Sequence, residues 1–219
     1  NGVSSIYALD TNGANSSTRV DGLSLLGPQN GDWAYVITCG SGSPRLSNLN
    51  IQNRGVSPVG DTYAVMINGT CTAILENSKI YAATATSGYC IGVGIFTAGA
   101  IIKNNSIYGT TGCAGAYGIN INSVTGFQLT DYNYIVVVGT GTADYPSGII
   151  VNSCTNTVIK NQNVSGGTGG SQIQIGIFLN SSANTTIQNN TVYSGVSGSS
   201  NSLGIYLSPT TTTSRIEGN

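Results

Sequence analysis

Residues 176–195 read GIFLNSSANTTIQNNTVYSG, and residues 148–166 read GIIVNSCTNTVIKNQNVSG. Both stretches contain short apolar segments with a period of two residues, separated by runs of Asn, Ser, Thr and Gly. That period is typical of β-strands, and such polar runs are typical of tight turns. Each stretch therefore predicts short strands joined by bends, and their similarity indicates a repeated unit.

Aligning the sequence with itself extends this unit along the chain. One apolar anchor occurs per repeat, at intervals of 26 to 30 residues: Val20, Leu46, Leu75, Ile102, Leu129, Ile159, Ile187 and Ile216. A second apolar residue follows most anchors by five positions: Leu25, Ile51, Ile80, Ile107, Val164 and Val192, with Tyr134 in the weakest repeat. A further strand per repeat has an inward face that we assign to Tyr35/Ile37, Val65/Ile67, Val93/Ile95, Ile119/Ile121, Ile149/Val151, Ile177/Leu179 and Ile205/Leu207. One repeat cannot bury its own apolar row, so the repeats must stack.

A bend-forming residue follows each anchor by two positions. These positions hold Gly or Asn, which readily adopt left-handed backbone angles, and one Asp: Gly22, Asn48, Asn77, Asn104, Asp131, Asn161, Asn189 and Gly218. Stacked Asn side chains can also form hydrogen bonds along the stacking axis. We therefore predict an Asn ladder at this bend, made of Asn48, Asn77, Asn104, Asp131, Asn161 and Asn189.

The two quoted stretches resemble the repeats of right-handed parallel β-helix proteins of the pectin-lyase-like superfamily, especially the NosD-type (PbH1) repeats. The resemblance covers nearly the whole chain from about residue 15. Together with the repeat it implies an all-β fold, a single-stranded right-handed parallel β-helix (β-solenoid) of about eight coils of 26–30 residues. We expect one domain over residues 1–219, with residues 1–15 as an irregular lead-in or partial cap.

Composition excludes several function classes. Charged residues make up 7% of the chain, the net charge is −1 and there is no His. Nucleic acids and anionic membranes attract clustered Lys and Arg, so neither is expected as a partner. No apolar run approaches the roughly 18 residues of a membrane span, so no membrane insertion is expected in this segment. Without His or a CxxC pair we expect no metal site, and we expect no cofactor.

The acidic residues give no catalytic pattern. Glycoside hydrolysis needs two carboxyl groups roughly 5 to 10 Å apart, and a calcium-dependent lyase needs an acidic cluster. The eight acids fall in different columns of the repeat: Asp10, Asp21, Asp32, Asp61, Glu76, Asp131, Asp144 and Glu217. The nearest group, Arg45, Glu76 and Lys103, is either a set of solvated surface ion pairs or a catalytic trio. We expect the former, and hence no catalytic residue.

The cysteines predict two disulfides between adjacent coils. Cys39 and Cys71 both follow the further strand of their coils, and Cys90 and Cys113 both precede it. Cys154 is left over, either buried and inert or paired outside the chain. Disulfides form in oxidising compartments, so we expect an extracellular or cell-surface location.

Two apolar surface features suggest binding. Tyr81, Tyr108 and Tyr193 share an outward column, where they can stack on sugar rings or shield the sheet. The outward positions of the further strand are Val36, Met66, Gly94, Asn120, Ile150, Phe178 and Tyr206. Their apolar members Met66, Ile150, Phe178 and Tyr206 form a candidate interface or glycan contact, covered by the chain itself or by another subunit. Asn15, Asn68 and Asn180 are candidate glycosylation sites.

The repeat and the missing catalytic pattern lead to two functional hypotheses. One is a non-catalytic extracellular structural module, a rigid building block of a surface layer, fibre or adhesin. The alternative is a carbohydrate-binding or polysaccharide-degrading domain, because the superfamily hosts many functions. A new coil starts at Ile216 and stops at Asn219 with no cap, so we expect continuation of the solenoid or self-association, with surface glycans as further candidate partners.

Overall fold

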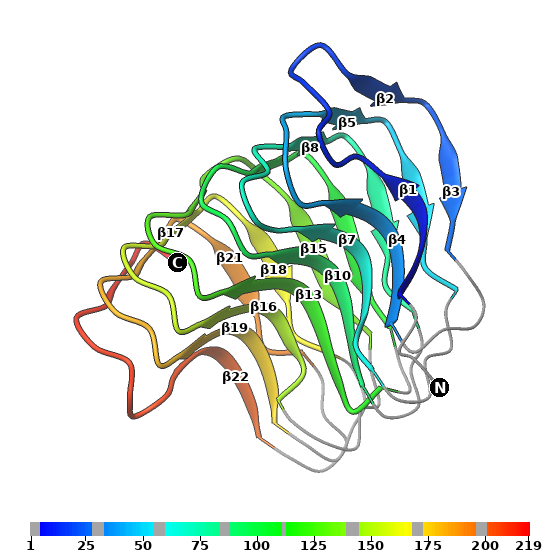
Figure 1. Cartoon of the computed structure of the whole chain (residues 1–219). Coiled ribbons are helices and arrows are strands. Elements are labelled where there is room, and N and C mark those ends of the chain that lie inside the picture. The colour runs from blue at the N-terminus through cyan, green and yellow to red at the C-terminus, as the bar shows by residue number, and fades with distance from the viewer. Residues whose placement is uncertain are drawn as a thin grey trace.

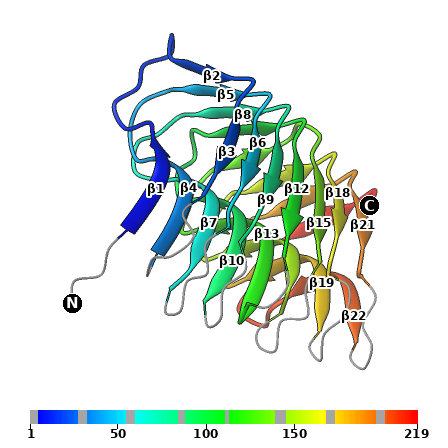
Figure 2. The ribbon, with the colours of Figure 1, turned by 90° about the vertical axis from the view of Figure 1, so that its right-hand side faces the viewer.

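The computed structural model describes residues 5–27, 33–54, 60–83, 88–110, 113–138, 145–167, 173–195 and 201–219. Within these ranges the chain folds into 23 β-strands and no helix (Figure 1). Strands that are far apart in sequence lie side by side, and the coils stack into an elongated body (Figures 1 and 2). None of the described residues belongs to a helix that could cross a membrane.

The first sheet has eight strands, and each pairs in parallel with the strand one coil away. Its members are β1 (Ser5–Asp10), β4 (Trp33–Cys39), β7 (Thr62–Ile67), β10 (Tyr89–Ile95), β13 (Gly115–Asn122), β16 (Ser147–Asn152), β19 (Gln174–Asn180) and β22 (Ser202–Leu207). Strand β1 lies within residues 1–15, which were expected to be an irregular lead-in or a partial cap. Residues 5–10 are not irregular, because Ser5 to Asp10 pair in register with β4.

The second face consists of two four-stranded sheets, and the third of one seven-stranded sheet. The second face contains β2 (Arg19–Asp21), β5 (Arg45–Ser47), β8 (Ile74–Glu76), β11 (Ile101–Lys103), β14 (Gln128–Leu129), β17 (Val158–Lys160), β20 (Thr186–Gln188) and β23 (Arg215–Glu217). The third sheet contains β3 (Ser24–Leu26), β6 (Asn50–Gln52), β9 (Lys79–Tyr81), β12 (Ser106–Gly109), β15 (Tyr134–Val137), β18 (Asn163–Ser165) and β21 (Thr191–Tyr193). This is the predicted parallel β-solenoid. The 23 strands make seven coils of three strands and a final pair, slightly fewer complete coils than the eight expected.

The core is a set of apolar columns that run along the solenoid. Six of the predicted anchors are at most 2% exposed: Leu46, Leu75, Ile102, Leu129, Ile159 and Ile187. The anchors of the outermost coils are less buried, with Val20 half-buried and Ile216 44% exposed. Each fully buried Ile or Leu side chain contributes about 1.5–3 kcal/mol. The stacking of coils therefore supplies the burial that no single coil has.

A break in the inward and outward alternation shapes the first sheet. A Cβ at Gly118, Gly148 or Gly176 would meet a side chain of the third sheet, and the residue that follows each of these glycines is fully buried in the core. A Cβ at Gly148 would lie 2.3 Å from Cγ1 of Val164, and one at Gly118 would lie 2.4 Å from Cγ2 of Ile135. At Gly118 and Gly148 a side chain would therefore overlap the third sheet, so glycine is needed at these positions.

The same break corrects two assignments in β4. Val36 occupies the column of these glycines and is fully buried in the core, so it does not face outward as expected. Tyr35 pairs with Tyr63 and packs with it on the outer face, so it does not face inward. The strict alternation of an unbroken strand placed both residues on the wrong side.

The predicted left-handed bend is confirmed at its five asparagines and two glycines. The φ angles of Asn48, Asn77, Asn104, Asn161 and Asn189 lie between 52° and 58°, and those of Gly22 and Gly218 are 68° and 62°. Asp131 does not adopt this conformation. Its coil has one extra residue in the bend, because Ile135 is the next fully buried apolar residue after Leu129, whereas Tyr134 is 38% exposed. The assignments of Asp131 and Tyr134 are therefore wrong.

The hydrogen-bonded ladder lies one residue beyond the predicted column. The bend asparagines are exposed, whereas the residues that follow them are buried: Leu49, which is apolar, and the polar residues Ser78, Asn105, Gln162 and Asn190. Asn133 joins this inner column after the extra residue in its coil. Asn133 Nδ2 donates to Gln162 Oε1 at 3.0 Å, and the backbone N of Gln162 donates to Asn190 Oδ1 at 2.9 Å. The left-handed residue turns the chain so that the next side chain points inward beneath the bend.

Both predicted disulfides are present. Cys39 bonds Cys71 and Cys90 bonds Cys113, each with a Cα–Cα distance of 5.9 Å. Cys154 is free and buried, as one of the two alternatives had it, and burial raises the pKa of its thiol. Two disulfides indicate a compartment outside the reducing cytoplasm.

Candidate binding groove on the first sheet

A second apolar cluster lies on the outer face of the first sheet, separate from the core. It contains Tyr63, Ile91, Tyr117, Ile150, Ile175 and Phe178, against which Met66 and Tyr206 pack partly buried. The register places Met66, Gly94, Asn120, Ile150, Phe178 and Tyr206 in one column. The structure thus brings the predicted outward strip together, interrupted at Gly94 and Asn120.

A groove of about 380 Å³ runs over this cluster from the start of β7 to the end of β19. Five aromatic rings line it: Tyr63, Tyr89, Tyr117, Tyr145 and Phe178. Four asparagines line it as well: Asn120, Asn122, Asn152 and Asn180. Asp61, Ile91 and Ile150 complete the lining. This volume lies within the usual range of ligand sites.

The aromatic rings are held by stacking and by one glycine. Tyr89 stacks on Tyr117 with centroids 5.3 Å apart, and Tyr145 contacts Phe178 at 5.5 Å. A Cβ at Gly94 would lie 2.5 Å from Cε1 of Tyr63, so the Tyr63 ring lies across Gly94. The glycine leaves room for the ring, and the rings present fixed faces toward the groove.

The amides form a second ladder along the groove, which the sequence interpretation missed. Asn180 Nδ2 donates to Asn152 Oδ1 at 2.9 Å, and Asn152 Nδ2 donates to Asn122 Oδ1 at 3.4 Å. Each of these residues is the last of its strand, in β13, β16 and β19. The sequence feature that could have revealed this ladder is the recurrence of Asn-Ser after an apolar strand in three successive coils.

Asn120 carries a buried acceptor atom beside the groove. Its side chain is 8% exposed, and its Oδ1 accepts no hydrogen bond from the part of the chain that the structure describes. A buried acceptor without a donor costs about 1–3 kcal/mol.

Asp61 places one carboxylate at the end of the groove. Its Oδ1 accepts a hydrogen bond from the backbone N of Tyr89 at 3.0 Å. Burial raises the pKa of Asp61, which the Tyr89 hydrogen bond opposes. Burial and the nearby Asp61 charge also raise the pKa of Tyr35 and of Tyr63.

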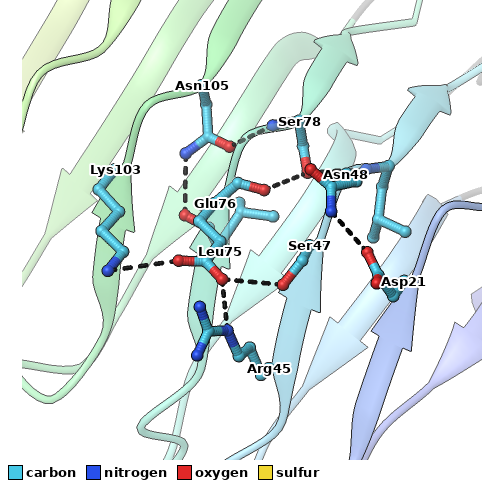
Figure 3. Close-up of polar contacts among 10 residues, drawn as sticks. Asp21, Arg45, Ser47, Asn48, Leu75, Glu76, Ser78, Lys103 and Asn105 are labelled. Atoms are coloured by element: carbon cyan, nitrogen blue, oxygen red, sulfur yellow. Dashed lines mark hydrogen bonds and ion pairs between the residues drawn. The ribbon is translucent and has the colours of Figure 1, made fainter.

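Glu76 lies on a different face, where neighbouring strands surround it with donors (Figure 3). Arg45 Nε pairs with Oε1, Ser47 Oγ donates to Oε1 at 2.9 Å, and Lys103 Nζ lies 3.3 Å from Oε2. Burial alone would raise the pKa of Glu76, but the hydrogen bonds from these three residues outweigh it and lower that pKa.

Glu76 is only 3% exposed, so the expectation of solvated surface pairing is wrong for this residue. A carboxylate in β8 whose oxygens are occupied by β5 and β11 ties three coils together. Its chemistry is that of a structural ion pair.

The predicted Tyr column is not continuous. Tyr81 stacks on Tyr108 at 4.9 Å, and Tyr108 contacts Tyr134 at 6.4 Å. Val136 and Ser165 separate Tyr108 from Tyr193, which is 58% exposed. The structure therefore brings two of the three predicted tyrosines together.

The remaining predicted sites are dispersed. Asp32 and Asp144 lie outside the described residues, and no three of the described His, Cys, Asp or Glu residues gather as metal ligands would. Among the candidate glycosylation sites, Asn15 is exposed and Asn68 is half-buried. Asn180 belongs to the groove ladder, where its Nδ2 donates to Asn152.

No family model matches the sequence, and neither does any curated protein or any solved structure.

Proposed function

We propose that this protein is a rigid, non-catalytic extracellular β-solenoid that binds carbohydrate in the groove of the first sheet. The observation that carries the proposal is the combination of aromatic rings and asparagine amides in one groove, with the buried acceptor of Asn120 among them. The repeats support a place among right-handed β-helices of the pectin-lyase-like type, which they resemble.

The groove has the two kinds of group that sugars need. Aromatic faces pack against the apolar faces of sugar rings. Amides donate and accept at once, which suits hydroxyl groups that do the same. The ladder of Asn122, Asn152 and Asn180 repeats these groups once per coil, at about 4.8 Å. An extended oligosaccharide lying along the solenoid would meet equivalent groups in successive coils.

The chemistry of the lining favours binding over cleavage. Hydrolysis uses two carboxyl groups roughly 5 to 10 Å apart. Asp61 is the one carboxylate among the described residues that line the groove. We therefore propose recognition without bond cleavage.

A rigid scaffold supports this role. The groove asparagines are on strands, and the disulfides join neighbouring coils. Binding groups held in place before the ligand arrives lose little conformational entropy on binding. Such a module suits a surface layer, a fibre or an adhesin, where a fixed orientation of the groove matters.

The proposal is tested with a glycan array followed by calorimetry on the oligosaccharides that bind. We expect Asn120→Ala and Tyr145→Ala to weaken binding about five- to tenfold, since each removes one contact worth about 1 kcal/mol. Tyr193→Ala removes an exposed ring from the third sheet and should leave binding unchanged. Ligand chain length should stay constant during incubation. Absence of binding to any glycan, or equal loss in all three variants, would overturn the proposal.

A further inference from the structure

The end of the groove at β7 and β10 differs chemically from the rest. Asp61, Tyr63 and Tyr89 lie there, whereas asparagines line the other end. The hydrogen bond from the backbone N of Tyr89 fixes Oδ1 of Asp61. The second carboxylate oxygen, Oδ2, has no partner among the described residues.

Asp61 gives this end a negative charge, and no cation among the described residues pairs with it. The described ion pairs involve Glu76 and Glu217, and the described lining of the groove includes neither Lys nor Arg. The carboxylate is half-buried, so water screens it less than a surface group. A charge held in this way favours a ligand of opposite sign and repels a like charge.

Tyrosine rings surround the same place. Tyr35 stacks on Tyr63 with centroids 5.7 Å apart, and Tyr89 stacks on Tyr117. Burial first, and then the charge of Asp61, raise the pKa of Tyr35 and of Tyr63. The face of an aromatic ring attracts an ammonium group, and it does so more strongly where water is partly excluded.

We infer that this end of the groove binds the protonated amino group of an amino sugar, so that oligosaccharides with free amines are preferred and uronic acid chains are rejected. The inference rests on the proposed carbohydrate binding. The ammonium group would donate to Asp61 Oδ2 and lie beside the Tyr63 ring, while the following sugar units meet Asn120 and the amide ladder.

Calorimetry with four oligosaccharides of equal length tests the inference: glucosamine, N-acetylglucosamine, glucose and galacturonate oligomers. The wild-type protein should bind the glucosamine oligomer about tenfold more tightly than its N-acetylated form, because acetylation removes the charge that pairs with Asp61. The galacturonate oligomer should bind least.

Two variants with the same change in charge provide the comparison. Asp61→Asn keeps an acceptor for the Tyr89 N–H and should abolish the preference, with binding of the N-acetylated oligomer unchanged. Asp21→Asn alters an exposed carboxylate on another face and should retain the preference. Equal affinity of the wild-type protein for the amine and N-acetyl forms, or a preference that survives in Asp61→Asn, overturns the inference alone. Failure of all four oligomers to bind overturns the inference, and absence of binding to every glycan on the array overturns it together with the proposed function.

Discussion

Asn105 donates two hydrogen bonds to Oδ1 of Asn133 in the next coil, one from its backbone N and one from its Nδ2, both at 3.1 Å. Asn133 in turn donates from Nδ2 to the carbonyl oxygens of Ile102 and Asp131. Both side chains are buried, so neither can exchange these partners for water.

We expect Asn133→Leu to lower the free energy of unfolding by about 2–4 kcal/mol, because it leaves buried donors and carbonyl groups unpaired. Urea denaturation monitored by circular dichroism measures the change. The matched control is Asn104→Gly, which replaces an exposed left-handed residue by one that tolerates the same φ and should cost under about 0.5 kcal/mol. Equal effects of the two substitutions would contradict a buried ladder.

The Glu76 ion pairs predict loss of stability in acid. The folded pKa is lowered, so unfolding takes up a proton once the pH falls below the unfolded value of about 4.3. The contribution of Glu76 is thus complete above that pH and disappears as the pH falls through the folded pKa. Since Arg45 and Lys103 are 39% and 33% exposed, we expect Glu76→Gln to cost only about 1–2 kcal/mol at pH 7.

Measuring the free energy of unfolding of the wild-type protein and of Glu76→Gln from pH 7 to pH 3 tests the predicted direction of this change. The difference between wild type and Glu76→Gln should shrink as the pH decreases. A difference that stays constant or grows in acid would rule out the ionised carboxylate as its source.

The inward glycines predict intolerance to a single methyl group. We expect Gly148→Ala to destabilise the fold by about 1–3 kcal/mol, because its Cβ would lie 2.3 Å from Cγ1 of Val164. Adding Val164→Ala removes that contact, so the double variant should lose less than the sum of the two single changes. Thermal unfolding of the wild-type protein, the two single variants and the double variant measures the coupling between Gly148 and Val164. Strict additivity of the two changes would show that these residues are not in contact.

Gly22→Asn is the control for replacing a glycine where the new side chain has free space. A Cβ at Gly22 has no neighbour within 4 Å, and asparagine occupies the same bend in other coils. This change should leave stability nearly unaltered.

The disulfide between Cys39 and Cys71 closes a separation of 32 residues. Replacing both cysteines by Ala should lower the free energy of unfolding by about 2–4 kcal/mol, mainly because the unfolded chain gains freedom. Urea denaturation measures this change.

Thiol titration tests the burial of Cys154. The native wild-type protein should react slowly, since Cys154 is buried, and the unreduced unfolded chain should expose one thiol. Fast reaction of the native protein would contradict this burial.

Sequence patterns identified features that depend on strong local signals. The anchors recur because each coil must bury Leu or Ile at the same place, and the five bend asparagines recur because few residues accept a positive φ. The cysteine pairs followed from the same register. The patterns failed at Asp131, where one extra residue shifts the register, and at Val36, where the strand does not alternate strictly between the inner and outer faces.

The groove was predictable only in part. Met66, Ile150, Phe178 and Tyr206 stood out as apolar residues on an outward face. Asp61 and Tyr145 did not, because they precede their strands next to loops of variable length, where the repeat gives no register. Asn122 and Asn152 resembled ordinary turn residues, and only the stacked coils show that their amides meet.

Each strand of the first sheet pairs with the strand one coil away, so the groove can lengthen by gain of whole coils. Because Asn122, Asn152 and Asn180 are related by this one-coil step, duplication of a coil would add another amide at the same spacing and lengthen the groove. The length of the oligosaccharide that we propose as ligand would then depend on the number of coils, while the Asp61 end of the groove stayed the same. Length and selectivity can therefore evolve separately in this fold.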